Sequence, residues 1–90
     1  MLDKKKFYIN GKWVDPIKSN DLDVINPSTE EVCAVISLGS KEDTNAAVSA
    51  AKSAFATWKD TSKKERIDLL EKLLSIYKKR YSEMADAISM

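Results

Sequence analysis

Few residues of this 90-residue chain have the chemistry of a catalytic centre, and the single cysteine, Cys33, is the first to consider. A thiolate acts as a nucleophile when a histidine, a nearby positive charge or a helix N-terminus lowers its pKa. The sequence contains no histidine, and Cys33 lies in an apolar stretch between Val32 and Ala34. We therefore expect a packed structural cysteine and not a nucleophile.

Other reactive constellations are also missing. Without histidine there is no catalytic triad and no histidine-ligated zinc, and one cysteine forms neither an intrachain disulfide nor a multi-cysteine metal site. The two glycines, Gly11 and Gly39, lie too far apart for a glycine-rich dinucleotide or phosphate loop. Asp68, Glu71 and Lys72 fall on the polar face of an expected helix, where we predict surface ion pairs and not acid–base catalysis.

The charge pattern gives no reason to expect nucleic acid or a membrane as partner. Lys and Arg number 15 against 14 Asp and Glu, a net charge of +1, whereas such partners call for a clustered basic face. The lysines at 4–6 are interpreted as a solvated terminus, and Trp13 and Trp58 as packing anchors outside any basic strip. Residues 1–10 lack the apolar core of a signal peptide, so the expected location is the cytoplasm.

The first part of the chain predicts short strands. Two β-prone runs, 7–9 and 12–14, flank Asn10-Gly11, the dipeptide that best tolerates the positive φ angles of a type I′ turn, and this predicts a β-hairpin. Residues 22–25 form a second short strand ending at an Asn-Pro turn. Residues 32–38 are apolar on both faces and β-branched, which predicts a strand buried on at least one side.

A helix is expected over residues 41–58. Ser40 and Asp43 form an N-terminal capping signature. The apolar stripe is rich in alanine, which predicts close approach to another backbone, with larger anchors at the C-terminal end. Its members are Ala47, Ala51, Ala54, Phe55 and Trp58.

A second helix, 62–90, is predicted by a capping box of Ser62 and Glu65 and by long helical periodicity. One apolar stripe consists of Ile67, Leu70, Leu74, Tyr77, Tyr81, Met84 and Ile88, and a second of Leu69, Leu73 and Ile76. This apolar surface is wider than one short partner helix covers. Because the pattern reaches Met90 without a helix-stop signal, we expect the chain to be the front of a longer protein.

In this order and spacing, the motifs resemble the N-terminal region of the NAD(P)-dependent aldehyde dehydrogenase superfamily, over about residues 7–90. The matching stretches are INGKWV at 9–14, VINPSTEEV at 24–32, ED at 42–43, AAV at 46–48, AAKSAF at 50–55, Trp58, ER at 65–66 and LL at 69–70. One departure is Glu31, where the family commonly has glycine; it concerns only the geometry of that turn.

The resemblance implies a parent enzyme that oxidises an aldehyde to a carboxylic acid with NAD or NADP as hydride acceptor. The family's nucleophilic cysteine, its glutamate, its oxyanion asparagine and its cofactor-contacting lysine have no matching position here, so no catalytic or cofactor-binding residue is assigned. In several members the backbone carbonyl before the Asn-Pro pair helps bind a structural monovalent cation. That position is Ile25, whose alternative interpretation is an ordinary strand residue before a turn.

The expected fold is thus an α+β fragment of the cofactor-binding domain: a β-rich segment 1–39, a helix 40–60 and a truncated helix 62–90. The expected partner is the remainder of the same polypeptide, and the parent is expected to be a homodimer or homotetramer. The alternative is a stand-alone interaction module that presents the apolar face of residues 67–88 to another protein.

Overall fold

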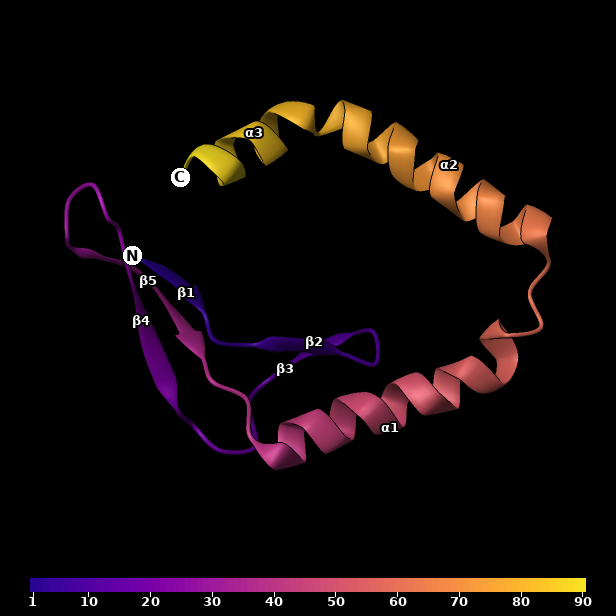
Figure 1. Ribbon diagram of the computed structural model, residues 1–90, viewed down its shortest axis with the longest axis horizontal. Helices are drawn as coiled ribbons and strands as arrows, with labels where there is room; N and C mark the ends of the chain where they lie inside the picture. Colours follow the sequence, from indigo (N-terminus) through magenta and orange to yellow (C-terminus); the bar gives the residue numbers. More distant parts are fainter. The chain divides into compact units, whose positions relative to one another are not determined.

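The structure is a computed structural model that describes residues 1–90. It consists of short strands followed by helices (Figure 1). In chain order these are β1 (Leu2–Lys4), β2 (Phe7–Ile9), β3 (Lys12–Val14), β4 (Asp21–Ile25), β5 (Val32–Ser37), α1 (Lys41–Trp58), α2 (Lys63–Lys79) and α3 (Tyr81–Ser89). The chain divides into two compact units, Met1–Ala56 and Thr57–Met90.

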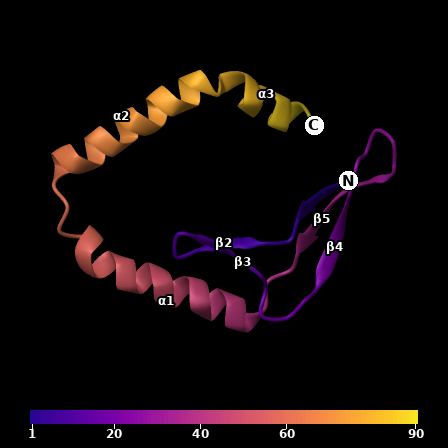
Figure 2. The same cartoon turned by 180° about the vertical axis from the view of Figure 1, so that it is seen from behind.

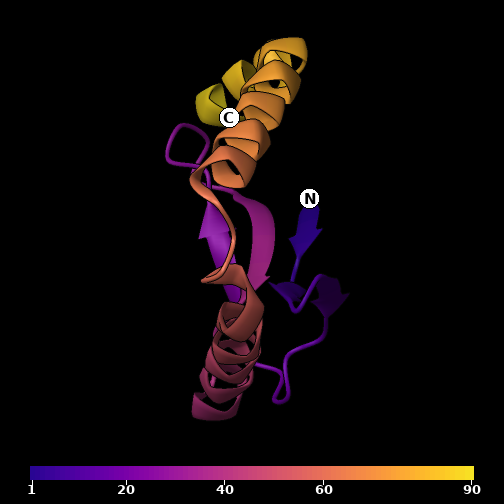
Figure 3. The ribbon, with the colours of Figure 1, turned by 90° about the vertical axis from the view of Figure 1, so that its right-hand side faces the viewer.

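In the first unit, β5 is the central strand of a three-stranded sheet with the order β1-β5-β4. β1 runs parallel to β5 and β4 antiparallel to it (Figure 3). The buried apolar residues of the chain, Ala34 and Val35, both lie on β5. The predicted strand over residues 32–38, buried on at least one side, is confirmed as Val32–Ser37, and its central place in the sheet comes from the structure.

β1 corrects the interpretation of the N-terminus as a solvated tail. Lys4 belongs to this strand and lies opposite Ile36 of β5, although its side chain stays exposed. The pairing is made by backbone groups, which every residue type carries. Since the partner strand follows some thirty residues later, the local sequence contains no sign of it.

β2 and β3 form the predicted hairpin, in the register Phe7↔Val14, Tyr8↔Trp13 and Ile9↔Lys12. The turn residues Asn10 and Gly11 have φ angles of 55° and 75°. Both angles are positive, as a type I′ turn requires. The hairpin prediction is confirmed.

The β4–β5 connection spans residues 26–31 and is closed by backbone hydrogen bonds. The Asn26 N–H donates to the Glu31 carbonyl at 2.9 Å, and the Glu30 N–H donates to the Asn26 carbonyl at 2.7 Å. Glu30 has a φ of 60°, a left-handed conformation that costs a non-glycine residue about 1–2 kcal/mol. The residue of this turn with a glycine-like backbone conformation is therefore Glu30, one position before Glu31, where the resemblance to the family placed the glycine.

α1 begins and ends as its pattern predicts, and it runs past the β2–β3 hairpin (Figure 2). Between the two elements is a shallow groove of about 330 Å³. Its lining residues are Tyr8, Ile9, Asn10, Gly11, Ala47, Ala50, Ala51 and Ala54. Ala51 and Ala54 are exposed, and no strand packs closely on α1, so the close approach of another backbone that the alanine stripe predicts is not found within this chain.

In the second unit, the single helix expected over residues 62–90 is divided in two at Arg80. Arg80 has φ −107° and ψ 20°, and its N–H is shared between the carbonyls of Ile76 and Tyr77 at 3.0 and 3.1 Å. Its guanidinium then pairs with Glu83 in the first turn of α3, with Nε–Oε2 at 2.9 Å. No proline or glycine marks the break, so the periodic pattern runs across it unchanged.

Neither α2 nor α3 contains a buried residue. The exposed side chains include Leu70 at 64% and Ile88 at 80% of full exposure. The expectation of a broad uncovered apolar surface on residues 67–88 is met. No helix of the chain has both the length and the apolar character needed to cross a bilayer.

Candidate functional site

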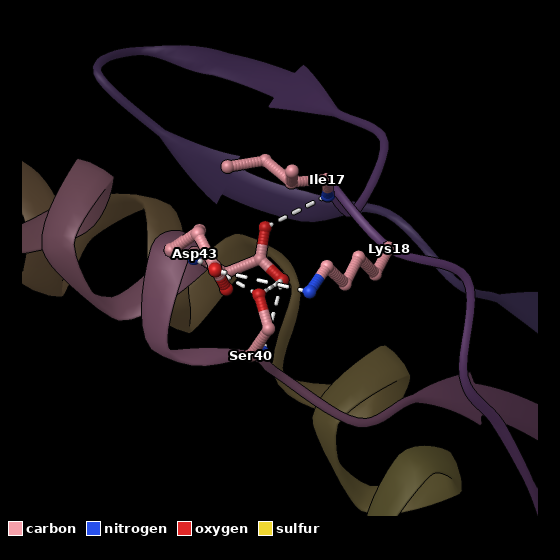
Figure 4. Close-up of polar contacts among 5 residues, drawn as sticks. Ile17, Lys18, Ser40 and Asp43 are labelled. Carbon is pink, nitrogen blue, oxygen red and sulfur yellow. Dashed lines mark hydrogen bonds and ion pairs between the residues drawn. The ribbon is translucent and has the colours of Figure 1, made fainter.

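The best-connected polar group of the first unit is the carboxylate of Asp43, in the first turn of α1 (Figure 4). Asp43 is only 6% exposed. One oxygen, Oδ1, accepts a hydrogen bond from the backbone N–H of Ile17 at 2.9 Å. The other, Oδ2, accepts from the N–H and the hydroxyl of Ser40 at 3.1 and 2.9 Å. In return, the Asp43 N–H donates to Ser40 Oγ at 3.2 Å, which completes the predicted cap of the helix.

The hydrogen bonds determine what Asp43 does chemically. The N–H of Ile17 is the largest cause that lowers the pKa of this carboxyl below its usual value, and the N–H of Ser40 follows, while burial acts in the opposite direction. A carboxylate that already accepts several hydrogen bonds and is held ionised is a poor proton acceptor for a substrate. Asp43 therefore acts as a connector that ties the segment after β3 to the start of α1.

The sequence revealed the Ser40–Asp43 half of this network and missed the Ile17 half. Spacing along the chain signals a cap because Ser40 and Asp43 are three residues apart. The Ile17 donor is a backbone amide, so its residue type carries no information. Only the fold brings it to the carboxylate.

Ion pairs occur at places other than those predicted. They join Lys5 to Asp21 at 3.7 Å, Lys18 to Glu42 at 3.9 Å and Arg80 to Glu83 at 2.9 Å. All of these side chains are more than 40% exposed, so each pair contributes little to stability. The surface pairs predicted for the polar face of α2 are wrong, because its acidic and basic side chains point into solvent without partners at ion-pair distance. These residues are Asp68, Glu71 and Lys72.

Cys33 lies in β5, half-buried, and its thiol donates a hydrogen bond to the Val24 carbonyl of the neighbouring β4 at 3.4 Å. No histidine is available to activate it. The thiol therefore links two neighbouring strands of the sheet, as expected for a structural cysteine.

Ile25 is the last residue of β4, opposite Val32 and directly after a register shift in the ladder. The turn that follows is braced by the Asn26 side chain, whose Oδ1 accepts from the Ser28 N–H at 2.9 Å. Nowhere in the chain do three His, Cys, Asp or Glu side chains gather closely enough to hold a metal ion. A cation at Ile25 would rely on carbonyl oxygens.

The sequence pattern predicts Trp13 and Trp58 to be packing anchors, but both side chains are exposed in this chain. Trp13 is 68% exposed and packs across the hairpin on Tyr8, with ring centroids 5.1 Å apart. It also lines a surface hollow with Asp3 and the lysines at 4–6, which corrects the expectation that it stands outside any basic strip. Trp58 is 47% exposed and has the Arg66 guanidinium 5.9 Å from its ring centroid.

Arg66 holds the turn between α1 and α2. The sequence contained no sign of this role, because Arg66 stood out only as part of the Glu65-Arg66 pair that resembles the family. Its Nε donates to Thr61 Oγ1 at 2.8 Å, and its terminal nitrogen donates to the carbonyls of Trp58 and Lys59 at 3.4 and 3.3 Å. The N-terminus of α2 is capped as predicted, with Ser62 Oγ accepting from the Glu65 N–H at 3.1 Å. The junction therefore satisfies backbone carbonyls that end α1.

Comparison with known proteins accounts for this arrangement. The model of the aldehyde dehydrogenase family matches residues 13–90. A 3-succinoylsemialdehyde-pyridine dehydrogenase of Pseudomonas sp is 43% identical over 89 residues, which cover 99% of this chain and 19% of that protein. The crystal structure of an aldehyde dehydrogenase from Bartonella henselae matches the whole chain at 62% identity and a TM-score of 0.95.

The chain spans about a fifth of the length of these relatives, 19% in each case. Its strands followed by helices form an α+β part of the aldehyde dehydrogenase fold. The family match extends from the hairpin to the last residue of α3 and beyond it to Met90. By sequence and by fold, the chain belongs to the aldehyde dehydrogenase family.

Proposed function

We propose that this chain is the N-terminal part of an enzyme that oxidises an aldehyde to a carboxylic acid, with NAD or NADP as the hydride acceptor. The observation that carries the proposal is the match of all residues to 19% of the Bartonella henselae dehydrogenase at 62% identity. Within that enzyme, residues 1–90 are proposed to form the N-terminal part of the cofactor-binding domain. Their segments would be the β-rich stretch 1–39, helix 40–60 and the helical stretch 62–90.

The proposed role of this segment is scaffolding. Its polar groups are used to join its own elements, as Asp43 joins Ile17 to Ser40. Its one thiol is hydrogen-bonded inside the sheet. The nucleophile, the base and the substrate pocket are assigned to the rest of the parent enzyme.

The residues of this chain do not fit a nicotinamide dinucleotide, which would accept the hydride in the parent enzyme. Dinucleotide pyrophosphates bind where a strand leads through glycines into an uncapped helix N-terminus. β5, Gly39 and α1 form a strand–turn–helix, but the Asp43 carboxylate already accepts hydrogen bonds at that N-terminus. A negative charge there repels a phosphate, so the cofactor site belongs to other parts of the parent.

We also propose that the Ile25 carbonyl is one ligand of a structural monovalent cation in the parent enzyme. Carbonyl oxygens are suitable ligands for such ions, and Ile25 ends a strand at a register shift, where the ladder is interrupted. The test is thermal unfolding of the parent in sodium, potassium or tetramethylammonium chloride. A lower midpoint with the bulky organic cation is expected, and equal midpoints would contradict the site.

The proposed setting is a cytoplasmic homodimer or homotetramer. The reading frame beyond Met90 tests the fragment proposal directly, because it is expected to encode a glycine-rich segment and a cysteine-bearing segment. A stop codon at that point, together with a monodisperse chain that melts cooperatively, would favour the alternative of a self-contained interaction module.

Activity is tested with a chimera in which this chain replaces the matching stretch of the Bartonella henselae dehydrogenase. The chimera is expected to reduce NAD or NADP when an aldehyde is added, at a rate within an order of magnitude of the unaltered enzyme, its matched control. The purified chain alone is expected to give no turnover. A folded but inactive chimera would contradict the proposed function, and turnover by the chain alone would contradict its scaffold role.

A further inference from the structure

The first unit has a surface hollow at the point where the chain passes from β1 into the β2–β3 hairpin. The hollow has a volume of about 530 Å³ and is lined by Asp3, the lysines at 4–6 and Trp13. Sites for small molecules occupy about 300–1,000 Å³. The hollow therefore combines ammonium groups and an indole ring in a space that is large enough for a small molecule.

Two of the lysines in the hollow have no counter-charge. Lys5 is paired with Asp21, with Nζ and Oδ2 3.7 Å apart. The Asp3 carboxylate is also engaged, because its Oδ1 accepts a hydrogen bond from the Lys5 N–H at 3.2 Å. Lys4 and Lys6 are exposed and have no carboxylate at ion-pair distance. Their two positive charges are therefore available to an anion.

The hairpin holds the indole ring of Trp13 in position beside these charges. Trp13 in β3 lies opposite Tyr8 in β2, and the two ring centroids are 5.1 Å apart. The indole is nevertheless 68% exposed. An exposed indole beside positive charges is a surface on which flat rings with an attached phosphate stack.

The number of charges indicates the class of ligand. Lysine binds phosphate as a point charge, and a phosphate monoester carries about −1.5 to −2 charges at pH 7. Two free ammonium groups match that charge more closely than they match a single carboxylate or phosphodiester. We propose that the hollow binds a small molecule in which a phosphate monoester is joined to a flat aromatic ring system, as in a nucleoside monophosphate. This site is independent of the proposed dehydrogenase activity.

A titration of this chain with adenosine monophosphate tests the proposal. The chain has two tryptophans, and Trp58 is an internal control because it lies near Arg66 and outside the hollow. The indole N–H resonance of Trp13 is expected to shift and saturate, while that of Trp58 stays in place. Equal shifts of both resonances, or no shift of either, would overturn the proposal.

Related ligands separate the two halves of the chemistry. Adenosine lacks the phosphate and inorganic phosphate lacks the ring, so each is expected to bind at least about fivefold more weakly than adenosine monophosphate. Equal binding of adenosine and its monophosphate would overturn the proposal. Tighter binding of a single-stranded oligoadenylate would show a nucleic-acid surface and would also overturn it.

Substitutions locate the site. Lys4→Gln and Lys6→Gln are each expected to weaken binding about threefold, as is usual for exposed charges. Lys12→Gln is the matched control, because it removes the same charge next to Trp13 but outside the hollow. Trp13→Leu, followed through the phosphorus resonance of the ligand, is expected to weaken binding at least about fivefold. If Lys12→Gln has the same effect as Lys4→Gln, the attraction is general and the proposal is wrong.

The same site is tested in the chimera with the Bartonella henselae dehydrogenase. With the cofactor site saturated with NAD, lysine acetylation by an activated ester is followed by mass spectrometry. Adenosine monophosphate at twice its dissociation constant is expected to slow the labelling of Lys4 and Lys6 about threefold and to leave Lys12 unchanged. If Lys4 and Lys6 are unreactive without the ligand, the hollow is closed in the whole enzyme and the proposal is wrong. Protection in a folded but inactive chimera would contradict the proposed function and support the hollow.

Discussion

The carboxylate of Asp43 in α1 accepts a hydrogen bond at 2.9 Å from the backbone N–H of Ile17, 26 residues earlier in the chain. The same carboxylate accepts two hydrogen bonds from Ser40. One side chain therefore caps a helix and anchors the loop that follows the β2–β3 hairpin. This relationship gives the first unit a long-range polar connection in addition to its strand pairing.

Replacing Asp43 with alanine should release the Ile17 amide. Amide hydrogen exchange at Ile17 is expected to be slow in the unaltered chain and at least tenfold faster in Asp43→Ala, because the N–H loses its acceptor. Glu42→Gln is the matched control, since the Lys18–Glu42 pair is exposed and 3.9 Å long. Unchanged exchange at Ile17 in Asp43→Ala would contradict the anchoring role.

The same contact should depend on pH. Because the hydrogen bonds from Ile17 and Ser40 lower the Asp43 pKa in the folded chain, the stability that they contribute is fully present above the unfolded pKa of about 3.9. It is lost as the pH falls through the lower folded pKa. Ile17 protection, corrected for intrinsic exchange, should therefore decrease as the pH falls below about 4.

Two variants identify the carboxyl group whose protonation causes this loss of Ile17 protection at acid pH. Asp43→Asn is expected to abolish it. Glu83→Gln should leave it intact at Ile17, although Glu83 also has a pKa lowered by its partner Arg80, first through the hydrogen bond and then through charge. If Asp43→Asn retains the transition, the titrating group is a different one.

The hairpin turn should be sensitive to loss of Asn10. With a φ of 55°, alanine at this position is strained, and Asn10→Ala should lower the free energy of unfolding of the hairpin by about 1 kcal/mol. Asn10→Gly should be neutral within about 0.5 kcal/mol. Trp13 fluorescence in urea, in a Trp58→Phe background, measures both variants. Equal stability of Asn10→Ala and Asn10→Gly would contradict the positive-φ assignment.

Removing Arg66 should loosen the α1–α2 junction. Arg66→Ala loses the hydrogen bonds to Thr61, Trp58 and Lys59, and because the site is exposed the expected loss is about 1 kcal/mol. Arg66→Lys should not restore it, because an ammonium does not reproduce the planar fork. Lys64→Ala, exposed on the same turn, is the control. Thermal melting of helical ellipticity measures the series, and full rescue by lysine would show that charge alone matters.

Local patterns were sufficient for much of this fold. The Asn10-Gly11 turn, the Ser40 and Ser62 caps and the range of α1 depend on residues within a few positions of each other, so the sequence predicts them correctly. The division at Arg80 was missed because it arises from backbone angles in a stretch without glycine or proline. The ion-pair partners were also missed, because Lys5 meets Asp21 through the arrangement of the strands.

The sequence alone determined that this chain has no histidine chemistry, no glycine-rich phosphate loop and a wide apolar surface on residues 67–88, since these depend on composition and periodicity. The tertiary structure decided which distant groups meet. β1 pairs with β5 and the Ile17 amide reaches Asp43 through backbone hydrogen bonds. Backbone groups are the same in every residue, so no pattern of side chains reports their partners.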